Sequence, residues 1–445
     1  MNKISFIIMG AGRGTRMKSS VSKVMHKVAG LPMINYVINA VKPLNPHIGC
    51  VVVNPDNKDE VGSVIGDVST VLQQDPNGTG SAVSACKDLF TAKNNTENTV
   101  IILNGDAPLI QTDTIAHLID TKNEVNADIS ILGFLADNPT GYGRIMIADD
   151  DFVDAIIEEK ECNDEQRQVN LCYSGIMAVS NKLLFELVDK IDNKNAKGEY
   201  YLTDIIKIAK SQGKKITFAI ADENEVMGCD SKIDLSVAEA ICQYNLRMRA
   251  LEQGVHMLSP ETVYFSHDTK IGKDVVIEPN VVFGLGVEIS NNTTIRAFSH
   301  FEKCIVGENS VVGPYARIRP ETVLQGDNKI GNFVEIKKSV IGKGSKINHL
   351  SYIGDTTMGD KVNIGAGTIT CNYDGYDKYK TKIGDNVFIG SNTAIIAPVN
   401  LSDDSMVGAG SVITKNVEKD QLALSRCEQN NIDNYSKEFR DLKEK

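Results

Sequence analysis

The sequence predicts two fold classes in one chain, an α/β domain followed by a parallel β-solenoid, with a helix between them. Up to about residue 220, short β-rich runs alternate with helical patterns. Between residues 229 and 254, apolar residues recur at helical spacing. From about residue 263, an aliphatic residue returns every six positions, usually before glycine or a small polar residue. We therefore expect three parts: residues 1–228, residues 229–254 and residues 255–445.

The first part has the alternation that builds a parallel sheet with helices on both faces. The expected strands include residues 4–8, 50–53, 71–72 and 100–103, and the expected helices include residues 32–41 and 81–89. Ligands of such sheets bind at the carboxyl ends of the strands. A glycine-rich loop that begins at Gly10 and the segment Asn104–Gly105–Asp106 both follow strands directly. We therefore expect a ligand site at that edge of the sheet.

The middle part predicts one long amphipathic helix. Its apolar residues recur every three or four positions, at Ile233, Val237, Ile241, Tyr244, Met248 and Leu251. Gly254 is a suitable residue to end the helix.

The third part predicts a parallel β-helix, because an aliphatic residue every six positions can point inward once per short strand of a stacked coil. Clear examples of the repeat begin at Ile271, Ile330, Ile341 and Ile383. The repeats outnumber the three that a solenoid usually needs. The period breaks at residues 370–382, which predicts a loop outside the coil, and such loops carry function. The tail after Val417 is charged and aperiodic.

Composition excludes several partner classes. The chain has 445 residues and a formal net charge of −11, which argues against broad binding to nucleic acid or to anionic membranes. No apolar run is long enough to span a bilayer or to form a signal-peptide core, so we expect a soluble, cytoplasmic protein. The nine cysteines include no Cys-x-x-Cys pair, which favours reduced thiols over disulfides or a zinc site.

The loop from Gly10 to Arg16 places backbone N–H groups and two guanidiniums where phosphates bind. It is neither a Walker A sequence nor a complete Rossmann fingerprint, so by itself it is also compatible with an ordinary turn. Asp106 ends a strand and is suited to Mg²⁺, although turn and helix-cap roles also fit this residue. Lys23 adds a further cation nearby in sequence.

Together these segments resemble the sugar-nucleotide pyrophosphorylases, through Gly10–Met17, Lys23, Gln73 with Gly78–Gly80, Gly141–Arg144 and Gly198–Asp204. Their order and spacing, together with the six-residue repeats of the third part, resemble the bifunctional N-acetylglucosamine-1-phosphate uridyltransferase and glucosamine-1-phosphate N-acetyltransferase family over nearly the whole chain. The resemblance implies a nucleotidyltransferase domain, a linking helix and a left-handed, hexapeptide-repeat acetyltransferase domain. It implies acetylation of glucosamine-1-phosphate by acetyl-CoA and then uridylyl transfer from UTP. The product would be UDP-N-acetylglucosamine for peptidoglycan and lipopolysaccharide precursors.

The resemblance also implies the residues of the uridyl site. Arg16 and Lys23 would act in catalysis by holding the triphosphate, and Asp106 and Asp230 would bind Mg²⁺. The substrate-binding residues would be Met9, Gly10, Ala11, Gly12, Lys23, Gln73, Gly78, Thr79, Asn104, Gly105, Gly143, Glu158, Tyr173 and Asp230. Two of these depart from the usual family pattern, because Tyr173 and Asp230 stand where asparagine is common.

In the solenoid, His349 stands out from the regular repeats around it, and Glu335 and Lys337 lie about one coil earlier. A histidine on a β-helix surface is often only solvated, but acetylation of an amine needs a base that works near neutral pH. By resemblance His349 is that base and Glu335 orients it. The sugar phosphate would contact Arg319, Lys337, Tyr352, Asn363, Asn372 and Tyr373, and acetyl-CoA would contact Ala366, Asn372, Tyr373, Ser391, Ala409 and Arg426. The resemblance further implies a homotrimer.

Two other functions remain open on the sequence alone. One is a pyrophosphorylase for another sugar, whose β-helix serves assembly or regulation. The other is a non-catalytic sensor of nucleotide sugars, which would not need Asp106 and Asp230.

Overall fold

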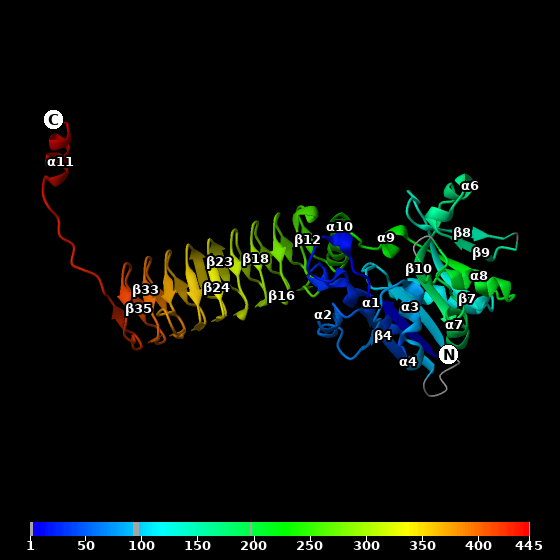
Figure 1. Ribbon diagram of the computed structural model, residues 1–445. Coiled ribbons are helices and arrows are strands. Elements are labelled where there is room, and N and C mark those ends of the chain that lie inside the picture. The colour runs from blue at the N-terminus through cyan, green and yellow to red at the C-terminus, as the bar shows by residue number, and fades with distance from the viewer. Residues whose placement is uncertain (1–2, 92–97, 149, 196–197, 445) are drawn as a thin grey trace. The chain divides into compact units, whose positions relative to one another are not determined.

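The computed structural model describes residues 3–91, 98–148, 150–195 and 198–444, and Figure 1 shows its elements along the chain. The chain forms two compact units, Met1–Gln243 and Tyr244–Lys445. None of the described helices combines the length and the apolar character needed to cross a membrane.

The first unit is built on one mixed sheet. Its strands lie in the order β11 (Ile216–Ala221), β7 (Ile129–Leu135), β10 (Leu171–Ser180), β6 (Thr99–Asn104), β1 (Ile4–Met9), β4 (Ile48–Val53) and β5 (Ser69–Leu72). The central residues Ile7, Val51 and Ile102 are fully buried, because helices cover both faces of the sheet.

The prediction of a purely parallel sheet was wrong at β10, which runs antiparallel to both β6 and β7. The other neighbours in the strand order pair in parallel. The chain between β7 and β10 contains the hairpin of β8 (Gly143–Ile147) and β9 (Val153–Ile157) rather than one crossover helix. Because a parallel pair needs a crossover and this segment supplies a hairpin, β10 enters the sheet in the opposite direction.

Helices pack on both faces of the sheet. Apolar residues of α1 (Met33–Val41) and α5 (Thr112–Glu124) belong to one core cluster. Those of α3 (Thr79–Ser84), α4 (Lys87–Thr91), α7 (Asn181–Val188) and α8 (Asp204–Ser211) belong to another. The helix expected at residues 81–89 is therefore two short helices. The remaining short helices are α2 (Lys58–Gly62), α6 (Asp164–Arg167) and α9 (Glu223–Val226).

Helix α10 (Lys232–Glu252) confirms the predicted long helix, and Gly254 follows its end with a φ of +94°. The expected apolar face was wrong in part, since Ile233 is 77% exposed and Tyr244 is 58% exposed. The buried positions include Ala238, Cys242 and Ala250, whose small side chains allow the helix backbone to approach its neighbours closely.

The second unit confirms the predicted β-helix. Its strands form three parallel sheets, which run from β12 (His256–Met257) to β37 (Leu422–Ala423), from β13 (Lys270–Ile271) to β34 (Val399–Leu401), and from β15 (Val282–Phe283) to β36 (Val412–Ile413). Three stacked sheets of this kind are the walls of a left-handed hexapeptide-repeat β-helix.

Each coil contributes inward aliphatic side chains to one continuous core. Ile295, Val312, Ile330 and Ile347 occupy matching positions of successive strands and are almost fully buried. Near the start of the coil, the stacked rings of Phe265, Phe283 and Phe301 have centroids 5.2 and 5.3 Å apart. These side chains fill the interior, so the six-residue repeat produces a β-helix with a close-packed core.

The break in the period also lies where expected. Strand β30 (Ile369–Cys371) and strand β31 (Thr381–Ile383) belong to different sheets, and residues 372–380 form a loop between them. The backbone N–H of Tyr379 donates to the carbonyl of Asn372 at 2.9 Å, which closes the loop at its base. The charged tail contains a further exposed helix, α11 (Tyr435–Lys443).

Candidate active sites

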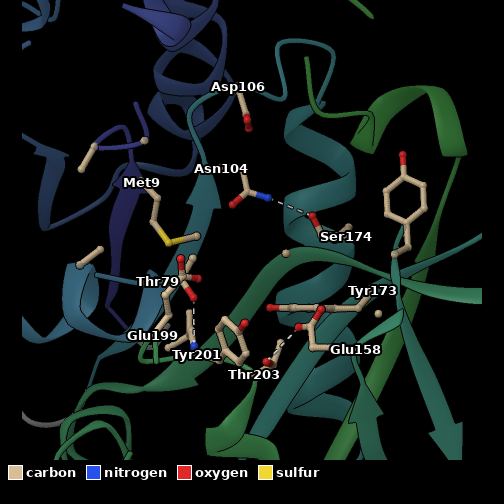
Figure 2. A pocket seen from close by; sticks show the side chains of 18 of the residues that line it. Met9, Thr79, Asn104, Asp106, Glu158, Tyr173, Ser174, Glu199, Tyr201 and Thr203 are labelled. Carbon is tan, nitrogen blue, oxygen red and sulfur yellow. Dashed lines mark hydrogen bonds between the residues drawn. The ribbon is translucent and has the colours of Figure 1, made fainter. Parts of the chain in front are cut away.

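A cavity of about 710 Å³ opens at the carboxyl ends of β1 and β6, where the sequence predicted a ligand site. Met9 ends β1 and Asn104 ends β6, and Figure 2 shows both side chains at the pocket with Asp106 beyond them. The predicted residues that line it are Met9, Gly10, Ala11, Gly12, Lys23, Gln73, Gly78, Thr79, Asn104, Asp106, Gly143, Glu158 and Tyr173. Gly105, Arg16 and Asp230 lie outside its lining.

The Gly78–Thr79 loop is held by the segment that follows Gly198. Thr79 Oγ1 accepts a hydrogen bond from the Leu202 N–H at 3.0 Å, and the Gly80 N–H donates to the Tyr200 carbonyl at 2.8 Å. Gly78 has a φ of +127°, and a Cβ there would lie 2.4 Å from the Tyr200 carbonyl oxygen. Only glycine allows this approach, which fixes one wall of the pocket.

Asn104 is oriented by β10. Its Nδ2 donates to the Ser174 carbonyl at 3.0 Å, a contact drawn in Figure 2. A Cβ on Gly175, whose φ is +85°, would lie 2.3 Å from that same nitrogen. The Ser174–Gly175 sequence therefore shapes the space that Asn104 occupies.

The opposite end of the pocket contains Gly143, Glu158 and Tyr173. Thr203 Oγ1 donates to Glu158 Oε1 at 3.2 Å, so the carboxylate points into the cavity in a fixed orientation. Beside it, the fully buried guanidinium of Arg144 pairs with Glu159 at 2.7 Å. The Arg144 hydrogen bond lowers the pKa of Glu159, and the pair ties the Glu158 turn to the neighbouring Gly141–Arg144 segment.

A compact charge cluster lies at the edge of the pocket, where Lys23 and Asp106 belong to the lining. The Lys23 ammonium contacts the carboxylates of both Asp106 and Asp230. Arg16 Nη2 lies 2.8 Å from Asp230 Oδ2, so this side chain joins the cluster from the solvent side. Burial lowers the pKa of Lys23, but the two carboxylates outweigh burial and raise the pKa above its usual value. Lys23 therefore stays charged among these oxygens.

The second candidate site lies on the outer surface of the β-helix. His349 is exposed at the end of β26 (Lys346–His349), and its Nδ1 lies 3.1 Å from Oδ1 of Asn332, which pairs with it across the sheet. Glu335, on β24 (Glu335–Lys337), lies 2.6 Å from Arg319 Nη1 and 3.8 Å from Arg317 Nη1. Among the described contacts, Asn332 rather than Glu335 orients the imidazole.

A cationic group lies on the neighbouring sheet of the β-helix, which contains β24. Lys337 follows Glu335 on β24, and the Lys378 side chain from the 372–380 loop lies within hydrogen-bonding distance of it. The pKa of Lys337 is lowered, first by this contact with Lys378, then by burial and by the charge of Arg319. Cations placed so close together can attract an anion such as a phosphate.

Comparisons with known proteins identify the family of the chain. Residues 6–158 match the family model of the MobA-like NTP transferase domain, and residues 380–415 match that of the hexapeptide repeat of succinyl-transferase. The bifunctional protein GlmU of Paramagnetospirillum magneticum is 43% identical over 99% of this chain and 97% of that protein. GlmU of Agrobacterium fabrum is 46% identical over 95% and 93%, and GlmU of Zymomonas mobilis is 41% identical over 99% and 98%. The chain belongs to the bifunctional GlmU family.

As a member of this family, the protein is a bifunctional transferase that takes part in UDP-N-acetylglucosamine synthesis for cell-wall precursors. It acetylates glucosamine-1-phosphate and transfers a uridylyl group to N-acetylglucosamine-1-phosphate. The nucleotidyltransferase model matches the first unit, and the acyltransferase repeat matches the second.

The remaining residues predicted for acetyl transfer lie along the later coils. Tyr352 begins β27 (Tyr352–Gly354), and Asn363 begins β29 (Asn363–Ile364). Asn372 is buried, and its Nδ2 donates to Asp355 at 2.5 Å, whereas Tyr373 is exposed on the loop.

Four of the residues predicted for acetyl-CoA share one edge of the coil, whereas Asn372 and Tyr373 lie in the loop of residues 372–380. The Asn392 N–H donates to the Ala366 carbonyl at 2.7 Å, and the Gly410 N–H donates to the Ser391 carbonyl at 2.8 Å. Arg426 Nη1 donates to the Ala409 carbonyl at 2.7 Å. Ala366, Ser391 and Ala409 therefore lie on successive turns, and Arg426 extends this edge.

Sequence reasoning missed several residues at the two candidate sites. Tyr201 and Thr203 line the pocket, although their segment was recognised only as a motif. Nothing in the sequence marks Asn332 as functional, since an asparagine in a six-residue repeat is an ordinary turn residue. Lys378 had a usable signal, because it lies in the loop that breaks the period.

Proposed function

We propose that the pocket at the ends of β1 and β6 is the uridyltransferase site and that the face around His349 is the acetyltransferase site. The observation that carries the first assignment is the cavity of about 710 Å³ with the Lys23, Asp106 and Asp230 cluster beside it. A nucleotide sugar needs a large concave site for the base and sugar, with charged groups at its phosphates.

In the first site, the Gly10–Gly12 loop, Gln73 and Thr79 hold uridine and its ribose, and Gly143 and Glu158 hold the sugar. Arg16 and Lys23 bind the triphosphate. An oxygen of the sugar phosphate attacks the α-phosphorus of UTP in line, and the bond from that phosphorus to pyrophosphate breaks. The cations stabilise the negative charge that develops on the phosphate oxygens.

The donor set of Asp106 and Asp230 fits Mg²⁺. Their carboxylates converge on one ammonium group, so these oxygens already hold a positive charge. Within the described parts of the chain, no group of three or more histidine, cysteine or acidic side chains forms a metal site. Mg²⁺ commonly uses one or two carboxylates and completes its coordination with water and substrate phosphates. When bound, it would neutralise charge on the triphosphate.

In the second site, His349 is the general base. If Asn332 Oδ1 accepts from the Nδ1–H of His349, Nε2 is left free to accept a proton. The nitrogen of the glucosamine amine bonds to the thioester carbonyl carbon, and Nε2 of His349 takes the proton that this amine loses. The carbon–sulfur bond then breaks, and the coenzyme leaves as a thiol after it receives the proton.

The anion site of Arg319, Lys337 and Lys378 holds the sugar phosphate, and Glu335 orients Arg319. Tyr352, Asn363, Asn372 and Tyr373 complete the sugar side. Acetyl-CoA lies along the edge formed by Ala366, Ser391, Ala409 and Arg426, where the Ser391 hydroxyl can donate to the developing oxyanion.

We further propose that this protein assembles as a homotrimer through its β-helix. An exposed apolar row runs along successive coils, formed by Phe298, Tyr315, Phe333 and Leu350. The rings of Phe298 and Tyr315 have centroids 4.9 Å apart, and those of Tyr315 and Phe333 are 5.2 Å apart. The row passes next to Asn332 and His349 in sequence, so a second chain seated there would cover the exposed acetyltransferase face.

A coupled assay tests the two assignments. Purified protein receives UTP, Mg²⁺, acetyl-CoA and glucosamine-1-phosphate, and the release of CoA and of pyrophosphate is followed separately. Asp106→Asn should lower pyrophosphate release by roughly 10³-fold or more, because the loss of a metal ligand removes several kcal/mol of transition-state stabilisation. CoA release should remain unchanged. The exposed residue Asp120 on α5 supplies the control Asp120→Asn. Equal loss of both activities in folded Asp106→Asn protein would contradict the assignment.

A further inference from the structure

Asp230 belongs to a turn that directly precedes helix α10, and this turn is held from two sides. On the first side, the Cys229 N–H donates to the backbone carbonyl of Asp106 at 2.9 Å. Cys229 is fully buried, and a Cβ on Gly228 would lie 3.9 Å from both carboxylate oxygens of Asp106. The turn therefore packs directly against the residue that supplies the other carboxylate of the charge cluster.

On the second side, one carboxylate oxygen accepts three hydrogen bonds. Asp234 Oδ2 accepts from the Ser231 N–H at 2.8 Å, from the Ser231 hydroxyl at 2.9 Å and from the Asp230 N–H at 3.1 Å. The Asp234 N–H donates in return to Ser231 Oγ at 3.3 Å. The exchange between Ser231 and Asp234 is a capping box, which satisfies N–H groups that the first turn of a helix leaves unpaired. The bond from Asp230 is additional to this box, so Asp234 holds the backbone of Asp230 as well as the helix end.

The start of α10 also contacts the segment that contains Lys23. Lys232 is the first residue of α10, and its Nζ lies 3.0 Å from Nδ1 of His26, three residues after Lys23. Burial, and secondly the charge of Lys232, lower the pKa of His26, so the imidazole is neutral and accepts this hydrogen bond. The helix start is therefore fixed relative to Lys23, and Asp234 fixes Asp230 relative to the helix start.

We propose that Asp234 is a positioning residue for uridylyl transfer, because it holds the Asp230 turn so that the Asp230 carboxylate meets Lys23 next to Asp106. Asp234 itself lies outside the lining of the pocket. This inference rests on the proposed assignment of the pocket to uridylyl transfer and of Asp230 to Mg²⁺. Residues that orient a metal ligand commonly change metal affinity or activity by roughly 10- to 100-fold when they are replaced.

Asp234→Ala tests the inference, because it removes all three hydrogen bonds to the carboxylate. The Mg²⁺ concentration that gives half-maximal pyrophosphate release should rise roughly ten-fold. The KM for N-acetylglucosamine-1-phosphate and the release of CoA should stay unchanged. Backbone deuterium exchange of the full chain, measured without Mg²⁺ or substrates, should become faster in residues 228–234. Asp234→Asn should restore the wild-type Mg²⁺ requirement, because its amide oxygen still accepts hydrogen bonds from these donors.

Two further variants complete the experiment. Ser231→Ala removes the hydroxyl and keeps the backbone donors, so it should raise the Mg²⁺ requirement in the same direction but less, and it serves if Asp234→Ala does not fold. Asp222→Ala is the matched control, since Asp222 caps α9 by accepting from the Asn224 N–H at 2.8 Å. Its loss should lower the thermal midpoint and leave the Mg²⁺ requirement unchanged.

The Asp106→Asn variant separates the two ways in which this inference can fail. If Asp106→Asn loses pyrophosphate release but Asp234→Ala and Ser231→Ala have the wild-type Mg²⁺ requirement, the positioning role of Asp234 is refuted, whether or not deuterium exchange is faster. An equal rise in the Mg²⁺ requirement of Asp222→Ala refutes it too, because any lost helix cap would then have the same effect. If Asp106→Asn keeps wild-type pyrophosphate release, the assignment of the pocket fails instead.

Discussion

The two proposed sites of this protein differ in how much of each is enclosed by one chain. In the first unit, Gln73, Asn104 and Tyr173 line a cavity whose walls hydrogen-bond to one another. In the second unit, His349 and Arg426 lie on an exposed surface. The first site is therefore a cavity that one chain forms before substrate binds. The second site is an open surface, with only one side formed by this chain.

The difference follows from the two folds. An open sheet leaves a crevice at the carboxyl ends of its strands, and loops can surround it. A β-helix fills its interior with aliphatic side chains, so its ligands must bind outside. Further walls must then come from a loop such as residues 372–380 or from a neighbouring chain. We therefore expect removal of the second unit to separate the two activities more sharply than any single substitution does.

Truncation to residues 1–254 tests this autonomy and has the largest expected effect. Acetyl transfer should vanish, because every residue assigned to it is removed. Uridylyl transfer from preformed N-acetylglucosamine-1-phosphate should stay within about two-fold, because the first unit has its own core.

The mass of both proteins in solution gives the second measurement. Light scattering should show a trimer for the full chain and a monomer for the fragment, which lacks the row from Phe298 to Leu350. A folded fragment without uridylyl transfer would show that the first site depends on the second unit. A trimeric fragment would move the assembly surface away from the β-helix.

His349→Ala should lower acetyl transfer by roughly 10²–10⁴-fold, which is the usual contribution of a general base. Uridylyl transfer should not change. Raising the pH should restore part of the lost rate, because more of the amine is then unprotonated without help. CoA release measured across the pH range checks both expectations.

The control for this variant is His300→Ala, an exposed histidine of the same β-helix on β18 (His300–Phe301). It should keep the wild-type rate at every pH. Wild-type acetyl transfer by His349→Ala at neutral pH would show that water or another residue accepts the proton.

Local patterns predicted most of the fold. The hexad predicted the β-helix, because each repeat meets the same neighbours in the next coil. Helical spacing predicted α10, but it failed to identify which face is buried, since Ala238 and Cys242 pack better than the larger Ile233. The direction of β10 was beyond local patterning as well, because it depends on a hairpin formed by a long intervening segment.

Side chains next to recognisable loops were predicted more readily than their contacts. Met9, Gly78 and Asn104 follow strands or turns and line the pocket as expected. The partner of His349 was not predicted, because Asn332 reaches it only when two coils stack. Asp106 and Asp230 both contact Lys23, although the three residues are far apart in sequence. The spacing of residues along the chain does not predict which of them meet in space.

Lys378→Met has the smallest expected effect and tests whether the 372–380 loop forms a wall of the open site. Removing one cation from the proposed phosphate site should raise the KM for glucosamine-1-phosphate roughly ten-fold, about one charge-assisted hydrogen bond, with little change in kcat. The pKa of Lys337 should rise, because Lys378 is the main group that lowers it. Lys337 would then remain protonated to higher pH, and the KM of the variant should resist alkaline pH better than that of the wild type. The control is Lys382→Met, an exposed lysine on β31 beyond the loop, which should leave KM unchanged. An unchanged KM for Lys378→Met would show that the loop does not bind the phosphate, and the second wall of this site would then have to come from another chain.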